Sequence, residues 1–199
     1  MAKTFEFWFD FGSPASYLAW TQLGSIEAAT GAKVALKPML LGGVFQATGN
    51  HSPVTIPAKG AYTFHDFARF ARRYGVPLNR NPYFPINTLM LMRGAVAFQM
   101  RHPDRLDDYL RCVFEAIWVD AQNMNQPEIV GTALQSAGFN AQEFMALIAD
   151  PAVKDRLKAL TQEAVERGIF GAPSFFVGPT LFWGQDRIDF VKEALLESP

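Results

Sequence analysis

Cysteine is nearly absent from this chain, because Cys112 is the only one among 199 residues. A single cysteine excludes an internal disulfide and leaves no Cys-x-x-Cys pair, so disulfide exchange by the protein's own thiols is excluded as well. The charges also nearly cancel, since 18 basic and 19 acidic residues leave a net charge of −1. Such a balance gives no reason to expect nucleic acid or an acidic membrane surface as a partner.

Long hydrophobic runs are missing too, and no stretch predicts a transmembrane helix. The chain enters a predicted strand at about residue 4 without a basic segment or an apolar run before it, so we expect no secretory signal. These absences favour the cytoplasm as the compartment. Hydrophobic residues nevertheless make up 49% of the chain, which is enough to bury a sizeable core in a compact soluble enzyme.

Histidine is scarce as well, and its spacing does not suggest a metal site. His51, His65 and His102 have no metal-ligand spacing with one another or with Cys112, so we interpret them as surface or packing residues. The sequence also shows no base partner for a Ser-His-Asp arrangement. We therefore expect neither a metal nor a nucleophilic serine.

The chain does contain an informative segment from Phe5 to Tyr17, which predicts a strand running into a helix. Phenylalanines at every second position from 5 to 11 alternate with other residues, the period of a strand, and Gly12 then allows a turn. Ser13 followed by Pro14 is typical of a helix start, with a hydroxyl cap and then a proline. A hydroxyl there can donate to an anion, although Ser13 could also serve only as a cap.

A second signal lies near the other end of the chain, where Pro173 precedes the short apolar run 174–177. Proline fits at the first residue of a strand, and a cis peptide there would leave the backbone of Ala172 free for an extended ligand. A turn, a short strand at 181–183 and a final helix to about residue 197 follow. Strand, helix and strand at the beginning, with a hairpin and helix at the end, predict an α/β, thioredoxin-like fold.

The middle of the chain is predicted to be helical. After a helix over 14–30 and a strand around 34–36, a loop rich in glycine and proline is expected over 38–57. Helices are then expected from about 59 to 74 and over 88–102, 104–120, 128–137, 141–149 and 152–167. We predict a thioredoxin-like domain formed by 1–41 and 154–199, with 42–153 as a large all-helical insertion that shapes the pocket for a second substrate.

Three segments together resemble a known family: FDFGSPASY at 9–17, FGAP at 170–173 and FWGQDR at 182–187. They are similar to the fingerprint of 2-hydroxychromene-2-carboxylate isomerases and kappa-class glutathione transferases, which are DsbA-like proteins, and the resemblance covers essentially the whole chain. It implies glutathione as cofactor, a small aromatic unsaturated acid as substrate, and a homodimer. Ser13 is then the catalytic residue beside the sulfur, as a hydrogen-bond donor to the thiolate.

The resemblance also implies which residues bind glutathione. Ala172 would pair with the cysteinyl backbone, and Asp186 would take the γ-glutamyl ammonium, although Asp186 could also be only a helix cap and Arg187 only a solvated residue. Asn50 and Lys59 are candidates of second rank. The complete predicted set is Ser13, Asn50, Lys59, Ala172, Pro173, Trp183, Gly184, Gln185, Asp186 and Arg187.

One departure from the family concerns the substrate. The naphthalene-pathway isomerases carry a lysine in the loop after the second strand, whereas residues 42–48 here (GGVFQAT) contain no cation. Lys59 or Arg93 could supply that charge, or the substrate could differ. Two other functions stay open: a kappa-type glutathione transferase or peroxidase, and a peptide-binding module that uses the cleft beside Pro173 without chemistry.

Overall fold

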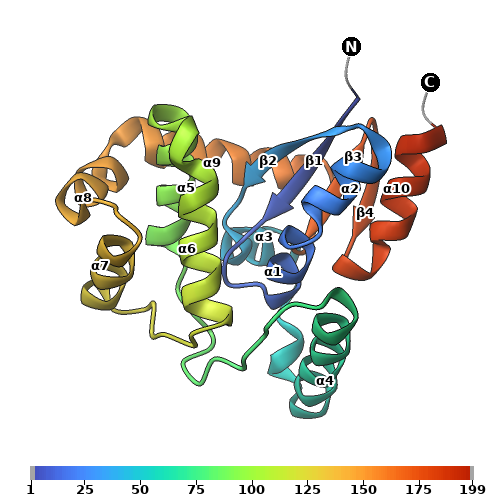
Figure 1. The fold of residues 1–199 in the computed structure, drawn as a ribbon, viewed down its shortest axis with the longest axis horizontal. Coiled ribbons are helices and arrows are strands. Elements are labelled where there is room, and N and C mark those ends of the chain that lie inside the picture. Colours follow the sequence, from blue (N-terminus) through green and yellow to red (C-terminus); the bar gives the residue numbers. More distant parts are fainter. Residues whose placement is uncertain (1–2, 198–199) are drawn as a thin grey trace.

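The structure, a computed structural model, describes residues 3–197. Its single sheet has the strand order β2-β1-β3-β4 and is formed by β1 (Thr4–Phe9), β2 (Lys33–Pro38), β3 (Ser174–Val177) and β4 (Thr180–Trp183). β1 pairs parallel with β2 and antiparallel with β3, which pairs antiparallel with β4. The predicted strands are confirmed, and the C-terminal hairpin completes the sheet that the N-terminal strand begins (Figure 1).

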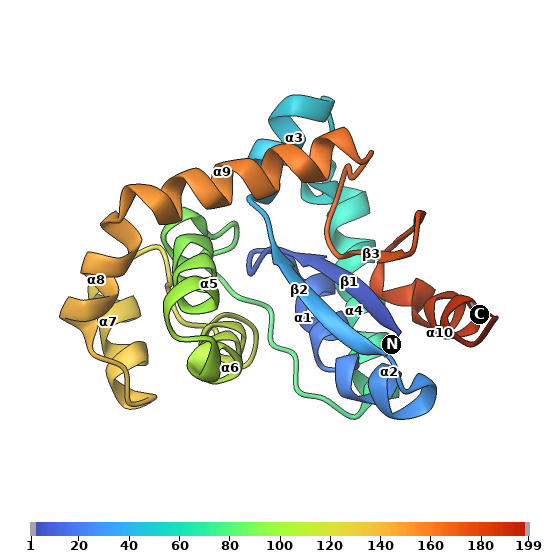
Figure 2. The same cartoon turned by 90° about the horizontal axis from the view of Figure 1, so that it is seen from above.

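Helices connect and cover these strands. Their bounds are α1 Pro14–Trp20, α2 Leu23–Thr30, α3 Leu41–Thr48, η1 Pro53–Thr55, α4 Pro57–Tyr74, α5 Leu89–Arg101, η2 Pro103–Arg105, α6 Leu106–Trp118, α7 Pro127–Ser136, α8 Ala141–Ala149, α9 Pro151–Glu166, η3 Gln185–Arg187 and α10 Ile188–Glu197. Figure 2 shows α9 crossing one side of the sheet, with α1, α2 and α10 on the other. No helix of residues 3–197 has the length and apolarity needed to cross a bilayer.

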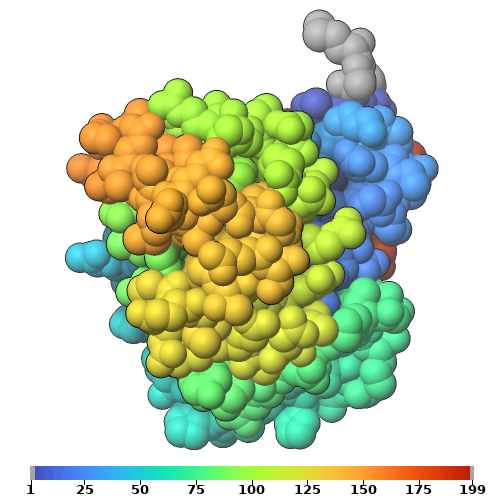
Figure 3. All heavy atoms as spheres, turned by 60° about the vertical axis from the view of Figure 1, so that its left-hand side comes forward, coloured from blue at the N-terminus to red at the C-terminus, as the bar shows by residue number. Residues whose placement is uncertain are grey.

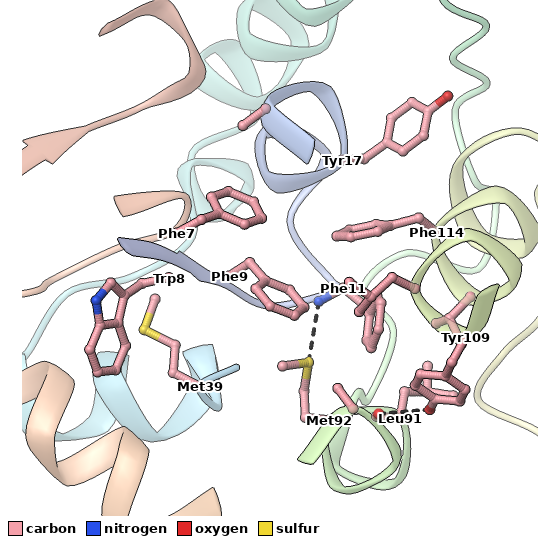
Figure 4. Close-up of a cluster of buried hydrophobic side chains, with 14 of the residues drawn as sticks. Phe7, Trp8, Phe9, Phe11, Tyr17, Met39, Leu91, Met92, Tyr109 and Phe114 are labelled. Carbon is pink, nitrogen blue, oxygen red and sulfur yellow. Dashed lines mark hydrogen bonds between the residues drawn. The ribbon is translucent and has the colours of Figure 1, made fainter. Parts of the chain in front are cut away.

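β1 lies at the centre of the core because both of its faces are covered. Phe5, Phe7, Phe9 and the following Phe11 are each at most 1% exposed, as the alternation predicts. Phe11 packs edge-to-face on Phe114 of α6 at 4.8 Å between ring centroids, which joins the strand to the helical part of the chain (Figure 4). The strand thus places the residues that follow it, 10–13, on a rigid support.

The helix predicted over 14–30 is two helices, so that prediction was wrong at its middle. α1 ends at Trp20, and its C-cap residue Thr21 donates its hydroxyl to the carbonyl oxygen of Leu18 at 2.7 Å. A threonine side chain that bonds the backbone in this way competes with helix continuation. The predicted end of the helical segment at residue 30 is confirmed, since Gly31 follows it with a left-handed φ of 70°.

The loop predicted over 38–57 was also wrong, because it contains α3 and η1. Gly42 and Gly43 in the first turn of α3 disfavour a helix. Two distant side chains satisfy the N–H groups at its start instead: Asp10 accepts from Leu41 N at 2.7 Å, and Thr161 accepts from Leu40 N at 2.9 Å. Tertiary contacts therefore form a helix that the local sequence does not indicate.

The bounds of the remaining helices agree with the predicted ranges to within two residues. Helices α5 to α8 pack against one another, and α5 and α8 also pack against α9, whereas α4 packs against α1 and η1. Figure 3 shows the first group, green to orange, as a continuous surface beside the blue N-terminal helices. Residues 42–153, the proposed insertion, thus contribute helices to two separate packing groups, one with α9 and one with α1.

Candidate functional site

The Ser13 hydroxyl accepts one hydrogen bond and donates another. As the N-cap of α1, its Oγ accepts from Ser16 N at 3.1 Å, so the predicted cap is present. Its hydroxyl also donates to the carbonyl oxygen of Ala172 at 3.0 Å. The side chain is only 6% exposed and faces a cavity. Ser13 therefore caps α1 and also links its start to the segment that precedes β3.

The Ala172–Pro173 peptide bond is cis. Pro173 O accepts from Gly184 N at 3.0 Å, which ties this segment to the end of β4. The carbonyl oxygen of Ala172 accepts the Ser13 hydroxyl, while the Ala172 N–H has no acceptor among the described residues. A partly exposed backbone N–H without an acceptor is suited to the carbonyl of an extended ligand.

η3 forms a second polar wall. The Asp186 carboxylate pairs with Arg187 at 2.7 Å, and both side chains are exposed, at 40% and 49%. Within residues 3–197, the N–H groups of Gln185 and Asp186 have no acceptor. Tyr74 of α4 donates its hydroxyl to Gln185 O at 2.9 Å, and burial, with Asp189 and Asp186 nearby, raises the pKa of Tyr74 to about 12. This hydroxyl therefore stays protonated and links α4 to η3.

Trp183 and two glycines form the mouth of the site. Trp183 is 49% exposed and packs on Phe170 with ring centroids 4.9 Å apart. A Cβ on Gly171 would lie 2.6 Å from Trp183 Nε1. Gly184 has a φ of 109°, and a Cβ there would overlap Asp186 Oδ1. Only glycine fits at either position without moving a predicted site residue.

Asn50 and Lys59 also line the cavity. The Asn50 amide donates to Phe170 O at 2.8 Å, so it holds the end of α3 against the segment before Ala172. Lys59, in the first turn of α4, shares a helix face with Thr63 and Phe67 at i, i+4 and i+8. It has no acidic partner in the described part of the chain.

One cavity of about 790 Å³ brings the predicted residues together: Ser13, Asn50, Lys59, Ala172, Trp183, Gly184, Gln185, Asp186 and Arg187 line it. Pro173 is buried and does not line the cavity. Arg93 does not line the cavity, which leaves Lys59 of the two cations considered for a substrate charge. Phe64, Phe67 and Phe84 supply apolar surface, with Phe64 edge-to-face on Phe84 at 5.8 Å.

Sequence reasoning overlooked Asp10 as a site residue. Asp10 lines the cavity, is 1% exposed and accepts from Gly12, Leu41 and Thr88. The available signal was a carboxylate in an otherwise apolar strand end, where a charge requires several donors. Across residues 3–197, no group of three or more His, Cys, Asp or Glu residues could hold a metal ion.

Comparisons with known proteins agree with this geometry. A family model described as a DSBA-like thioredoxin domain matches residues 4–196. A 2-hydroxychromene-2-carboxylate isomerase from Sphingobium xenophagum is 31% identical over 99% of this chain and 100% of that protein. Glutathione S-transferase kappa 1 from Homo sapiens is 27% identical over 99% of this chain and 92% of that protein.

A solved structure of a selenomethionine 2-hydroxychromene-2-carboxylate isomerase superposes with a TM-score of 0.84 at 26% identity, covering 96% of this chain and 94% of that one. The sheet, the helices around it and the serine beside a cis-proline define a thioredoxin-like protein of the DsbA type. The chain belongs to the DsbA-like thioredoxin family, with 2-hydroxychromene-2-carboxylate isomerases and kappa-class glutathione transferases among its relatives. The predicted fold and resemblance are confirmed.

Proposed function

We propose that the protein is a glutathione-dependent cis–trans isomerase of the 2-hydroxychromene-2-carboxylate isomerase type. One observation carries this proposal: the Ser13 hydroxyl lies 3.0 Å from the Ala172 carbonyl oxygen, inside a cavity that Asp186 also lines. A hydroxyl, a peptide backbone and a carboxylate are the groups needed beside the thiol, the cysteinyl backbone and the ammonium of glutathione. The isomerase relative at 31% identity supports the choice.

The residues present fit glutathione. The cavity of about 790 Å³ lies within the range of roughly 300 to 1,000 Å³ typical of small-molecule sites. The partnerless N–H of Ala172 would bind the cysteinyl carbonyl, and Asp186 would bind the γ-glutamyl ammonium. The N–H groups of Gln185 and Asp186 would bind the carboxylate at that end, with Arg187 nearby, while Lys59 and Asn50 line the same cavity.

Ser13 would change its hydrogen-bond acceptor when the cofactor binds. Its hydroxyl has one proton, which the Ala172 carbonyl oxygen accepts in this structure. An incoming cysteinyl N–H would bond to that oxygen instead and leave the Ser13 hydroxyl free to donate to sulfur. A charge-assisted bond of this kind favours the thiolate over the thiol and lowers the thiol pKa.

When bound, glutathione supplies a thiolate that adds reversibly to an electron-poor double bond, so that rotation and elimination isomerise the substrate and return the thiol. The chain's own residues would orient the aromatic acid. Phe64, Phe67 and Phe84 offer flat apolar surface, and Lys59 is placed to bind a carboxylate because it shares the helix face of Phe67. We propose an unsaturated aromatic 2-oxo or 2-hydroxy acid as the substrate class.

Product analysis tests the proposal. Unsaturated aromatic 2-oxo and 2-hydroxy acids are incubated with the protein and with glutathione at a tenth of the substrate concentration. We expect every substrate molecule to reach the equilibrium ratio of its isomers with all glutathione recovered, because elimination returns the thiol. Consumption of one glutathione per turnover would contradict the isomerase and favour a kappa-type transferase.

A kappa-type glutathione transferase or peroxidase is the second candidate, and two observations favour it. The human kappa transferase is 27% identical over nearly the whole chain, and the segment 42–48 lacks a cation. Such an enzyme would use the same thiolate but release a conjugate or reduce a peroxide. Calorimetry without detectable glutathione binding at millimolar concentration would contradict both enzymes and favour the peptide-binding module.

The proposal includes the cytoplasm as compartment, where glutathione is plentiful, and a homodimer as assembly. The first point depends on the proposed use of glutathione as cofactor. The second is tested by light scattering coupled to size exclusion, in which a mass near the 22.1 kDa of one chain would contradict the dimer.

A further inference from the structure

Asp10 is a buried carboxylate with three donors from three parts of the chain. Its Oδ1 accepts from Gly12 N at 2.8 Å and from Thr88 Oγ1 at 2.7 Å, and its Oδ2 accepts from Leu41 N at 2.7 Å. No basic side chain of residues 3–197 forms an ion pair with it. Burying a carboxylate costs folding free energy unless hydrogen bonds compensate for the lost water, and three donors provide that compensation here.

Each of these donors belongs to a different wall of the cavity. Gly12 is in the turn that ends at Ser13, and the Asp10 carbonyl oxygen closes that turn by accepting from Ser13 N at 3.1 Å. Leu41 is the first residue of α3, and Thr88 is the N-cap residue of α5. All three donors' segments line the cavity together with Asp10.

Asp10 adds a bond at each of these two helix starts, where Thr161 also accepts from Leu40 N and Asn87 accepts from Leu89 N. Leu40, the N-cap of α3, has no side-chain oxygen, and Thr88 makes no cap bond within α5. Thr88 turns its hydroxyl to Asp10 instead. A single carboxylate therefore fixes the spacing between the Ser13 turn and the first residues of two helices.

We propose that Asp10 is a positioning residue, whose three hydrogen bonds hold the Ser13 turn in register with the walls formed by the starts of α3 and α5. This inference rests on the proposed function in so far as Ser13 is taken as the thiol-activating residue. Asp10 acts through Ser13 and the cavity walls, without itself donating to the substrate.

Asn is the informative replacement because it keeps the shape of Asp10 and changes the bonding. Burial raises the pKa of Asp10, while the bonds from Gly12, Leu41 and Thr88 lower it. An amide has one acceptor oxygen and one NH2 group, and the NH2 would face an N–H donor at Gly12 or Leu41. At least one of the three segments must then move.

Trp118 provides a reporter that needs no ligand. Its indole N–H donates to Phe11 O at 2.8 Å, within the same turn, and the side chain is fully buried. Phe11 N also donates to Met92 Sδ at 3.5 Å (Figure 4). Any displacement of residues 10–13 therefore changes the chemical shift of the Trp118 indole proton, which Trp118→Phe assigns among the four tryptophans.

The test compares Asp10→Asn with the wild-type chain. We expect the Trp118 indole resonance to move, the glutathione-saturated rate to fall roughly tenfold or more, and glutathione affinity to change less. The pH midpoint of the bound thiol, read as thiolate absorbance, should rise because the Ser13 hydroxyl is misplaced. A fall of that midpoint would overturn positioning in favour of a through-space charge effect.

Two further variants keep the result interpretable. Thr88→Val removes one of the three bonds and should move the Trp118 indole resonance by a smaller amount. This variant tests the inference even if Asp10→Asn does not fold. Asp150→Asn is the matched control, because Asp150 accepts from Ala152 N at the start of α9 and does not line the cavity. It should lower the melting temperature without moving the Trp118 resonance or the thiol midpoint.

The outcomes separate this inference from the proposed function. A lower melting temperature in Asp10→Asn and Thr88→Val, with an unmoved Trp118 resonance and unchanged rate, would make Asp10 a stability residue only and overturn the inference. Absence of glutathione binding by the wild-type chain would overturn the proposed function instead. In that case the Trp118 resonance still tests whether Asp10 holds the turn.

Discussion

At the scale of single residues, Ser13 carries the central assignment because one side chain makes two bonds with different functions. Its oxygen caps α1 through Ser16 N, and its proton goes to Ala172 O. Loss of the cap alone costs about 0.5 to 2 kcal/mol of stability, so reduced stability in a variant does not identify the chemical role. The pH titration of a bound thiol does identify the chemical role of Ser13.

Ser13→Ala should therefore raise the pKa of glutathione's thiol in the complex. Loss of one bond to a charged group, about 1.5 to 3 kcal/mol, corresponds to roughly one to two pKa units at 1.36 kcal/mol each. The thiolate is favoured above its pKa, so turnover at neutral pH should fall and partly recover as the pH rises. Thiolate absorbance against pH measures this, and an unshifted midpoint would leave Ser13 with its cap alone.

Asp186→Asn should weaken glutathione binding with a smaller effect on the saturated rate. Asp186 is 40% exposed and already pairs with Arg187, so solvent screening limits the loss to about 1 kcal/mol, roughly fivefold in Kd. Asp189→Asn is the matched control, because Asp189 lies in the first turn of α10 and does not line the cavity. Equal affinities in both variants, measured by calorimetry, would reduce Asp186 to a surface residue.

At the scale of elements, the approach to β3 is tightly packed against β4. Gly171→Ala should displace Trp183, because the new Cβ would lie 2.6 Å from Trp183 Nε1. We expect weaker glutathione binding and a changed tryptophan emission. Gly24→Ala in α2 meets nothing within 4 Å and should leave both unchanged, with stability higher by about 0.5 to 1 kcal/mol. Similar glutathione affinity in the two variants would contradict the close packing of Gly171 against Trp183.

The elements also show what sequence patterns can predict. β1 and the stops at Gly31 and Gly75 follow from local chemistry, namely period-two phenylalanines and left-handed glycines. α3 does not, because its start is satisfied by Asp10 and Thr161, which lie 31 and 121 positions away. Patterns within one segment carry no information on such distant partners.

The same distinction applies to the candidate site. Ser13, Ala172 and Asp186 were named because short motifs contain them, and the structure places all three at one cavity. Asp10 stands in one of those motifs, yet its partners at 12, 41 and 88 come from separate elements. Its importance follows from the fold and could not be derived from the motif.

At the scale of the whole molecule, the chain has one thiol of its own, and it should be inert. Burial, with Glu115 and Asp120 nearby, raises the pKa of Cys112 to about 11. The thiolate is the reactive form, so at pH 8 only about one thousandth of Cys112 is reactive. Iodoacetamide should label the native protein slowly and the denatured protein fully, as mass spectrometry can show. Rapid native labelling would contradict the burial of this thiol.

That prediction has a practical use for the whole enzyme. If Cys112 is inert, thiolate absorbance and alkylation in the complex report on bound glutathione and not on the protein. Cys112→Ser provides the control, since Cys112 contacts Ala133 O and does not line the cavity. The variant should keep the same thiol titration.

The bond between Ser13 and Ala172 joins residues 159 positions apart, and it has a consequence for biosynthesis. Chains leave the ribosome at roughly 5 to 20 residues per second, so Ala172 is synthesised about 10 to 30 s after Ser13. Over that time β1, with its phenylalanines, has β2 as a neighbour but lacks β3. A nascent chain therefore exposes an aromatic strand edge that holdase chaperones can protect, and its proposed glutathione site is complete only when the last segment has emerged.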